Sequence, residues 1–361
     1  MPNRIAVFAS LLCLGTSAIA AEYVVETVAD GLSYPWSVAV LDDGSLLVTE
    51  RTGQLRRVGP SGDVSEPVEG VPFVYFAGQG GLHDIVLDPG FENNRTVYMS
   101  YAEGTPGENR TAVARAVLSA SSLNNVEVIF RVTPGKDTPV HYGARLAFLQ
   151  DGTLLLTTGD GFDYREAAQD IRSGLGKVIR INTDGSAAAG NPFPESPFVW
   201  SYGLRNPQGL AVARDGTVYL HDHGPAGGDE VNVIAAGVNY GWPAITYGLD
   251  YNGAYVSPYT EWDGMQQPLH YWTPSIAPSG LAVYEGDMFP EWQGNLFVGA
   301  LVDREVRRLE IDAGSVSKEE RAFAEIESRV RDVRVGPDGA IYVVTDGEDG
   351  KVLRISRSAR D

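Results

Sequence analysis

Short runs of alternating apolar and polar residues, joined by an Asp-Gly or similar turn, recur along the chain. Five clear copies are SVAVLDDGSLLVTE from Ser37, DIVLDPGFENNRTVYMSYA from Asp84, ARLAFLQDGTLLLTTGD from Ala144, GLAVARDGTVYLHD from Gly209 and DVRVGPDGAIYVVTD from Asp332. A looser copy, GLAVYEGDMFPEWQGNLFVGAL, begins at Gly280. Alternation with a period of two is typical of β-strands, and Asp-Gly between two such runs predicts a hairpin, because glycine adopts positive φ at little cost.

Six copies over about 340 residues leave a little under 60 residues for each. That length suits a four-stranded sheet with a long loop, which is the unit of a propeller blade. We therefore predict an all-β fold, a six-bladed β-propeller with four-stranded antiparallel blades. Because the copies are so similar to one another, a large β-sandwich is the weaker alternative. The runs YVVETV, from Tyr23, and GKVLRI, which ends at Ile355, are predicted to share one blade and so to close the ring.

The first twenty residues, MPNRIAVFASLLCLGTSAIA, have one positive charge, an apolar stretch from Ile5 to Leu14 and small residues at their end. This pattern predicts a secretory signal peptide, since the apolar stretch is shorter than the roughly 20 residues that cross a bilayer. Cys13 is the only cysteine, so the mature chain has no disulfide and no cysteine metal site. We expect residues 1–20 to be removed, residues 21–361 to form a single propeller domain, and the protein to be exported to a periplasm.

The mature chain is strongly acidic. Removal of Arg4 with the signal peptide leaves 27 Lys and Arg against 47 Asp and Glu, a net side-chain charge of −20. Such a surface repels phosphate backbones and anionic lipid. Nucleic acid and membrane insertion are therefore not expected, and most of the charge is interpreted as an aid to solubility.

Two clusters offer polar groups near the start of a predicted inner strand. In AGQGGLHD, residues 77–84, the glycines allow close backbone approach and leave Gln79 as the one long polar side chain. In PVHYGARLAF, residues 139–148, His141 stands at the mouth of a blade, where a histidine can act as a general base near neutral pH. A glycine-rich turn and a structural histidine are the alternatives.

Two further clusters are basic. Arg205 and Asn206, in SYGLRNPQGLAV, offer fixed donors for an oxygen-rich anion or a quinone carbonyl. Arg329 and Arg331, in SRVRDVRV, share one face of a predicted strand, an unfavourable arrangement unless an anion lies between them. In a chain this acidic, the pair indicates a carboxylate site, with a salt-bridged surface strand as the alternative.

The stretch HDHGPAGGDEVNVI, residues 221–234, suggests a metal site. His221 and His223 would share a strand face, so a zinc pair is geometrically feasible, but no third ligand has a recognisable local spacing. Asp229 and Glu230 are hard oxygen donors, which suit calcium better than zinc. The spacing is not that of an EF-hand loop.

Together the clusters resemble the soluble pyrroloquinoline quinone (PQQ)-dependent sugar dehydrogenases, the glucose/sorbosone dehydrogenase family. The motifs are GQGGLHD, HYGARLAF, LRNPQGL, HGPAGGDEVN, NYGWP and RVRDV, and the resemblance runs from about Pro35 to Ile355. It implies a six-bladed propeller with PQQ and calcium at one end of the channel. The implied reaction oxidises an aldose to an aldonolactone, with hydride transfer to PQQ and an unidentified electron acceptor, in a monomer or homodimer.

The resemblance also implies roles for individual residues. His141 matches the general base and Arg205 the residue that stabilises charge on the quinone oxygen; both contact PQQ. The remaining residues implied to hold PQQ are Gln79, Asn206, Arg329 and Arg331. The backbone carbonyls of Gly224 and Pro225 match ligands of the calcium beside PQQ, while Glu230 and Tyr240 match ligands of a second, structural calcium. His221 and His223 receive no role.

Two positions depart from the best-known glucose dehydrogenases, and they bear on how PQQ is held as well as on the substrate. Val302 stands where those enzymes have a PQQ-contacting lysine, and Val140 stands where they have an acidic residue. We therefore expect the breadth of the family's aldose dehydrogenases rather than preference for glucose. A calcium-dependent propeller lactonase, or a non-catalytic binding propeller, remains the alternative. Convergence of Arg205, Arg329 and Arg331 on one pocket containing His141 would favour the quinone.

Overall fold

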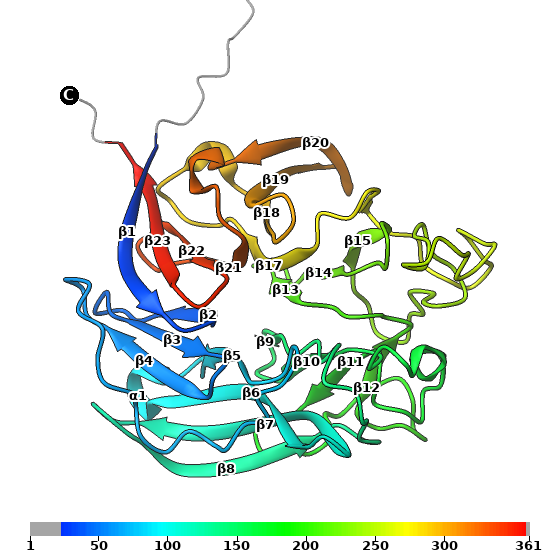
Figure 1. Cartoon of the computed structure of the whole chain (residues 1–361), viewed down its shortest axis with the longest axis horizontal. Coiled ribbons are helices and arrows are strands. Elements are labelled where there is room, and N and C mark those ends of the chain that lie inside the picture. Colours follow the sequence, from blue (N-terminus) through cyan, green and yellow to red (C-terminus); the bar gives the residue numbers. More distant parts are fainter. Residues whose placement is uncertain (1–22, 359–361) are drawn as a thin grey trace, which may run out of the picture.

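The computed structural model describes residues 23–358, so the predicted signal peptide lies outside the described residues. Within this range the strands form six antiparallel sheets around a common centre (Figure 1). Helix is limited to α1 (Phe91–Asn94) and three short 3-10 helices, η1 (Arg165–Gln169), η2 (Pro290–Trp292) and η3 (Ala324–Ile326). The predicted six-bladed all-β propeller is confirmed.

The strands of the first three blades follow one another along the chain. The first blade contains β2 (Pro35–Val40), β3 (Leu46–Glu50) and β4 (Gln54–Val58). The second contains β5 (Leu82–Leu87), β6 (Thr96–Thr105), β7 (Glu108–Leu118) and β8 (Leu123–Arg131). The third contains β9 (Leu146–Phe148), β10 (Leu154–Thr158), β11 (Lys177–Ile181) and β12 (Val199–Tyr202).

The remaining blades include the closing sheet. The fourth contains β13 (Gly209–Val212), β14 (Val218–Asp222), β15 (Asp229–Val233) and β16 (His270–Trp272). The fifth contains β17 (Pro278–Val283), β18 (Leu296–Ala300), β19 (Glu305–Asp312) and β20 (Ser315–Ala322). The sixth joins β21 (Val330–Val335), β22 (Ile341–Thr345) and β23 (Gly350–Arg357) to β1 (Tyr23–Leu32).

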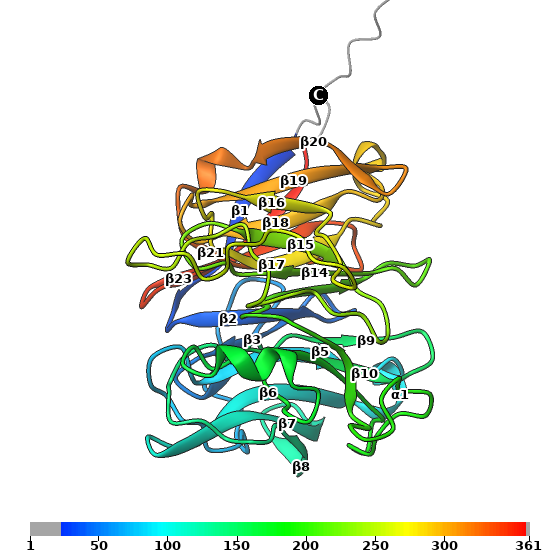
Figure 2. The same ribbon diagram turned by 90° about the vertical axis from the view of Figure 1, so that its right-hand side faces the viewer.

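Each recurring sequence phrase forms the two inner strands of one blade. The innermost strands β2, β5, β9, β13, β17 and β21 each contact their neighbours around the ring. β1 pairs with β23, with Tyr23 opposite Arg357, as expected for a ring closed by both ends of the chain (Figures 1 and 2). Closure removes a free sheet edge.

The first blade departs from the expected four strands. Its outer position is taken by the segment 64–68, in which Ser65 N–H donates to Arg57 and Val68 N–H to Leu55, both at 2.8 Å. Pro67 has no N–H and interrupts a regular ladder, so the sheet is counted as three-stranded.

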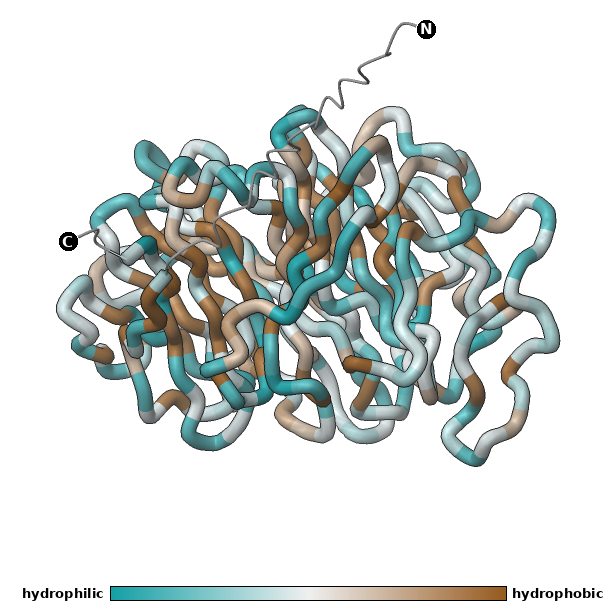
Figure 3. The backbone as a smooth tube through the Cα atoms, turned by 90° about the horizontal axis from the view of Figure 1, so that it is seen from above, coloured by the Kyte–Doolittle hydropathy of each residue, from teal (hydrophilic) through white to brown (hydrophobic). Residues whose placement is uncertain are grey.

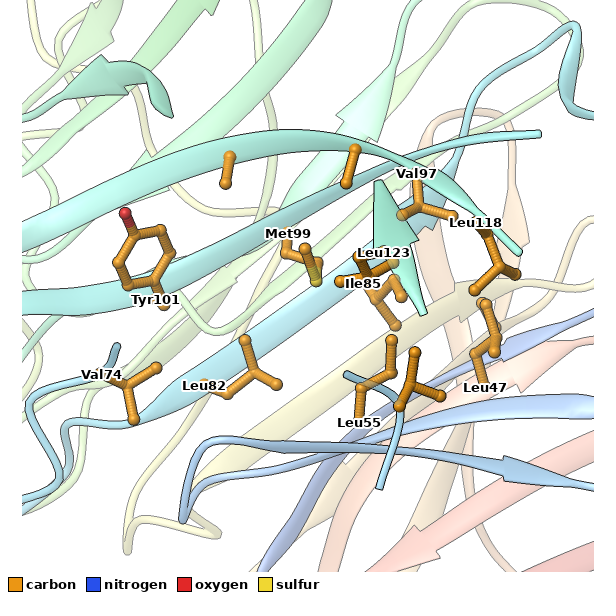
Figure 4. Packing of buried hydrophobic residues seen from close by; sticks show 14 of the residues in the cluster. Leu47, Leu55, Val74, Leu82, Ile85, Val97, Met99, Tyr101, Leu118 and Leu123 are labelled. Carbon is orange, nitrogen blue, oxygen red and sulfur yellow. The ribbon is translucent and has the colours of Figure 1, made fainter. Parts of the chain in front are cut away.

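Apolar side chains fill the space between neighbouring blades. Between the first and second blades, Leu47 and Leu55 pack with Leu82, Ile85 and Met99, all buried (Figure 4). Hydrophobic stretches lie mainly within the body and hydrophilic stretches on its loops (Figure 3). This packing holds the strand ends that carry the candidate site in fixed positions. None of the helices in residues 23–358 is long and apolar enough to cross a membrane.

Candidate active site

A cavity of about 330 Å³ lies at one end of the propeller and receives side chains from all six blades. Most of its lining residues stand near the start of an inner strand or just after the second strand of a blade, positions that meet at the same end of antiparallel sheets, and Tyr251 comes from the connection between β15 and β16. The volume falls within the roughly 300–1,000 Å³ typical of small-molecule sites. Among its lining residues are all six predicted PQQ contacts, Gln79, His141, Arg205, Asn206, Arg329 and Arg331.

His141 is buried in the cavity wall, with 4% of its surface exposed. Its backbone N–H donates to Gln79 Oε1 at 2.8 Å, and its Nδ1 lies 2.7 Å from Asp160 Oδ1. Because an ionised carboxylate only accepts, the ring proton lies on Nδ1, which leaves Nε2 as the basic nitrogen. The residue has a φ of 53°, in the left-handed region, so its placement is conformationally costly and is maintained by its surroundings.

Asp160 orients this histidine and was not singled out by the sequence. Besides His141, its carboxylate accepts hydrogen bonds from Trp242 Nε1 at 2.8 Å and from Phe162 N–H at 2.7 Å. Burial alone would raise the pKa of Asp160, but hydrogen bonding and charge from His141 lower it below its ordinary value. Burial lowers the pKa of His141, and the Asp160 hydrogen bond opposes that effect. The pair is therefore a carboxylate beside a neutral imidazole at pH 7.

Arg205 and Asn206 are held by a second buried carboxylate. Asp222 accepts the backbone N–H of both residues, each at 2.6 Å. The Arg205 guanidinium donates to the Gly224 carbonyl at 2.9 Å and to the Tyr251 hydroxyl at 3.2 Å. A fixed cation thus stands in the same cavity as His141.

Arg329 and Arg331 both bind Asp346, at 3.1 and 3.3 Å. The sequence predicted an anion between them, and the chain itself supplies one. Asp346 also lines the cavity, and its single negative charge neutralises only one of the two arginine charges. Gln208 accepts a further hydrogen bond from Arg331 at 2.9 Å.

The model of the Glucose / Sorbosone dehydrogenase family matches residues 32–354. The chain belongs to this family. It is 39% identical over 360 residues to the aldose sugar dehydrogenase YliI of Escherichia coli strain K12, with 96% of each chain covered. It is homologous to the aldose sugar dehydrogenases and is an oxidoreductase of that type.

Two solved structures show the same architecture. The soluble aldose sugar dehydrogenase from Escherichia coli, in its apo-form, gives a TM-score of 0.89 at 40% identity and covers 93% of this chain and 100% of that one. The PQQ-bound form of the aldose sugar dehydrogenase from Streptomyces coelicolor gives 0.79 at 30% identity and covers 94% of this chain and 100% of that one.

The predicted calcium loop of this family member is organised by Asp229. Its carboxylate accepts the Gly224 N–H at 2.9 Å, and its other oxygen accepts from Ser275 Oγ at 2.6 Å and from Ile276 N–H at 2.8 Å. Gly224 thereby turns its carbonyl toward the Arg205 guanidinium. Pro225 lines a smaller adjoining pocket that Arg205 also lines. The Gly224 carbonyl therefore already accepts a hydrogen bond from a positively charged group.

Glu230 and Tyr240 differ in whether their side-chain oxygens are available to a metal ion. Glu230 lies opposite Asp222 in the sheet, and burial followed by the Asp222 charge raises the pKa of Glu230 to about 8. Asn232 donates to Glu230 at 3.2 Å, while its own Oδ1 is buried without a partner among the described residues. The Tyr240 hydroxyl donates to Val233 and accepts from Ala235 N–H. Glu230 and Asp222 thus lie together without an ion-pair partner within residues 23–358, whereas the Tyr240 hydroxyl already has two hydrogen-bond partners.

His221 and His223 do not form a side-chain zinc site within residues 23–358, where no group of three or more His, Cys, Asp and Glu is arranged to hold a metal. His221 lies in β14, and its Nε2 is bonded to the Ser279 carbonyl. His223 follows the strand, and its ring lies 6.2 Å from that of His221. Burial lowers the pKa of both, that of His221 to about 3, so both rings are neutral.

The two variant valines lie outside the cavity lining, and Val302 is 57% exposed. The structure instead adds residues that the sequence did not single out: Asp160, Asp222 and Asp346, together with Arg51 and Tyr251. One feature of the sequence could have identified the three acidic residues: three copies of the recurring phrase end in an aspartate, at Asp160, Asp222 and Asp346.

Proposed function

We propose that this dehydrogenase oxidises aldoses to aldonolactones by hydride transfer to PQQ held in the 330 Å³ cavity, with His141 as general base. The observation that carries the proposal is the convergence of Arg205, Arg329 and Arg331 with the His141–Asp160 pair in one cavity. A lactone needs no such set of arginines, whereas a quinone with three carboxylates does.

The lining fits this cofactor in charge and in hydrogen bonding. Arg329 and Arg331 present guanidinium groups, whose fork matches carboxylate geometry, and Gln79 and Asn206 add polar groups between the blades. PQQ would supply the electrophilic carbon that accepts hydride, which no protein side chain offers. Arg205, held by Asp222 and Gly224, would place positive charge beside the acceptor oxygen as negative charge develops there.

His141 has the arrangement of a general base. Its free Nε2 would accept the proton of the anomeric hydroxyl while hydride leaves the same carbon, so the sugar loses two electrons and two hydrogens. Asp160 would stabilise the resulting imidazolium and keep the ring in one tautomer. A positioned base is typically worth about 10²–10⁴ in rate.

Calcium is the proposed metal, at two places. Gly224 and Pro225 would offer carbonyl oxygens beside the cavity, where the Gly224 oxygen already attracts a cationic donor. Glu230 would serve a second, structural site, supported by the unpartnered Asn232 Oδ1 and by the absence of a basic partner for Glu230 among the described residues. Tyr240 would contribute only through its backbone, because its hydroxyl is engaged. Carboxylate and carbonyl oxygens are the donors that calcium prefers.

Calcium is expected to raise the melting temperature of the wild-type protein by several degrees at saturating concentration, because binding to the folded state alone stabilises it. Glu230→Gln should lose most of this increase, since the amide cannot ionise to become a negatively charged ligand opposite Asp222. Melting curves with EDTA and with calcium measure the difference. Glu92→Gln, on exposed α1, is the matched control. An equal calcium-dependent increase in both variants would remove Glu230 from the site.

The pH profile should report the buried base. His141 must be neutral to accept a proton, and burial lowers its pKa below the ordinary value of about 6.5. The kcat/KM of the wild type should therefore remain high as the pH falls to about 6.5 and decline only below it. Rate measurements from acidic to neutral pH test this. An acid limb centred above the ordinary histidine value would contradict the assignment.

The alternative function is the calcium-dependent lactonase. An assay of lactone hydrolysis without PQQ separates it from PQQ-dependent dye reduction by an aldose. We expect only the second reaction. The predicted signal peptide supports a periplasmic location for this chemistry, and cell fractionation would test it.

A further inference from the structure

Arg51 enters the cavity from the first blade, directly after β3. Its backbone is fixed on both sides: its N–H donates to Tyr34 at 3.0 Å, and its carbonyl accepts from Leu82 N–H at 3.1 Å. Gly81 allows this close approach of the second blade, because a Cβ there would lie 2.1 Å from the Arg51 carbonyl oxygen. The position of Arg51 is thus set by contacts between two blades.

The Arg51 side chain is a cation with no acidic group in direct contact among the described residues. Its guanidinium lies 5.3 Å from the ring centre of Tyr34 and 5.6 Å from that of Phe76. Its Nε is buried without a hydrogen-bond partner, and within residues 23–358 the side chain forms no ion pair. Burial and the neighbouring charge of Arg331 lower the pKa of Arg51, and the charge of Asp346 opposes them only in part. Stacking on two rings compensates only part of the cost of such burial.

The other three cavity arginines are engaged. Arg329 and Arg331 share Asp346, and Arg205 donates to Gly224. Four arginines and one aspartate line the cavity, so its lining carries a net charge of +3 with neutral histidines. Arg51 therefore supplies one of three uncompensated positive charges in a protein whose overall charge is strongly negative.

We propose that Arg51 is a further cofactor-binding residue, whose guanidinium holds one of the three carboxylates of PQQ. This inference rests on the proposed function. A charge that costs stability in the free protein and faces a cavity is accounted for if an anion pairs with it there. The aromatic pair of Tyr34 and Phe76 orients the guanidinium, so little further ordering would be needed when the ligand binds.

The test is titration of PQQ into the purified apoprotein, first with EDTA and then with calcium. Protein fluorescence or calorimetry measures the binding. Arg51→Met removes the charge but keeps an apolar stem against Tyr34 and Phe76. Arg51→Lys keeps the charge. Arg57→Met is the matched control, because Arg57 lies in the same blade, pairs with Asp43 and does not line the cavity.

Arg51→Met should raise the Kd for PQQ about 10- to 100-fold and weaken the dependence of binding on salt, as expected for loss of a charged hydrogen bond. Arg51→Lys should fall between Arg51→Met and the wild type, and Arg57→Met should match the wild type. The Arg51→Met apoprotein should melt at or above the wild-type temperature, because an unpaired and partly buried charge has been removed.

Wild-type affinity in Arg51→Met would overturn the inference and leave the proposed function standing. A marked fall in the apoprotein melting temperature of both Arg51 variants, with binding reduced only in proportion to the folded fraction, would assign Arg51 a structural role and overturn it as well. Failure of the wild type itself to bind PQQ would instead reject the proposed function.

Discussion

Substitution of His141 by alanine is expected to lower kcat about 10²- to 10⁴-fold while PQQ binding changes little. The imidazole is the one basic group of the cavity whose second nitrogen is already fixed, by the 2.7 Å contact with Asp160. Its loss removes the proton acceptor but none of the arginines that would hold the cofactor carboxylates. Dye-linked turnover and PQQ titration on the same preparation separate the two effects.

His270→Ala is the control for this variant, because His270 lies outside the cavity and pairs with Glu319. It should retain wild-type turnover. Retained turnover in His141→Ala would contradict the assignment of the base, and loss of PQQ binding in that variant would show that His141 holds the cofactor rather than the proton.

Asp160→Asn is expected to lower kcat by at least about 10²-fold, again with PQQ binding retained. The amide keeps the size of the carboxylate and can still accept a hydrogen bond from Trp242, but it no longer stabilises an imidazolium. The acid limb of the pH profile should also move to lower pH, because Asp160 raises the pKa of His141 against the effect of burial.

The matched control is Asp163→Asn, an exposed aspartate three residues further along the chain. It should leave both kcat and the pH profile unchanged. A fall in kcat with an unshifted acid limb in Asp160→Asn would indicate general damage to the site rather than a lost partner of His141.

The arrangement of the blades could be predicted because its signals are local. In the phrase from Ser37, two short apolar runs predict two buried strands, and the Asp-Gly turn sets the pairing of β2 with β3. The motifs around Gln79, His141 and Arg205 each precede an inner strand, so a propeller with equivalent blades brings them to one end. The sequence therefore indicated that these residues meet at one end of the propeller, and the structure shows that they line one cavity.

The partners of these residues could not be predicted in the same way. Asp160 lies 19 residues after His141, and Asp222 lies 17 residues after Arg205; their contacts depend on how neighbouring segments pack. Arg51 occupies a hairpin turn, where a solvated arginine is ordinary, and its partial burial depends on the approach of the second blade. Tyr251 lies in the long connection between β15 and β16, which has no strand periodicity to place it.

The stretch HDHGPAGGDEVNVI shows how local chemistry can mislead. Its histidines attract attention as metal ligands, yet His221 is bonded to a backbone carbonyl and both rings are buried and neutral. His223 lines the cavity with a neutral ring, whereas the Gly224 carbonyl accepts a hydrogen bond from Arg205 and Asp229 accepts the Gly224 N–H. Backbone oxygens leave no trace in composition, so only the structure or a family resemblance can indicate them.

The most direct test of the proposed function is reconstitution of the purified apoprotein with PQQ and calcium, followed by dye reduction with a panel of aldoses. The account predicts saturable PQQ binding and sugar-dependent dye reduction that requires PQQ. Absence of PQQ binding, together with no activity on any aldose, would contradict it.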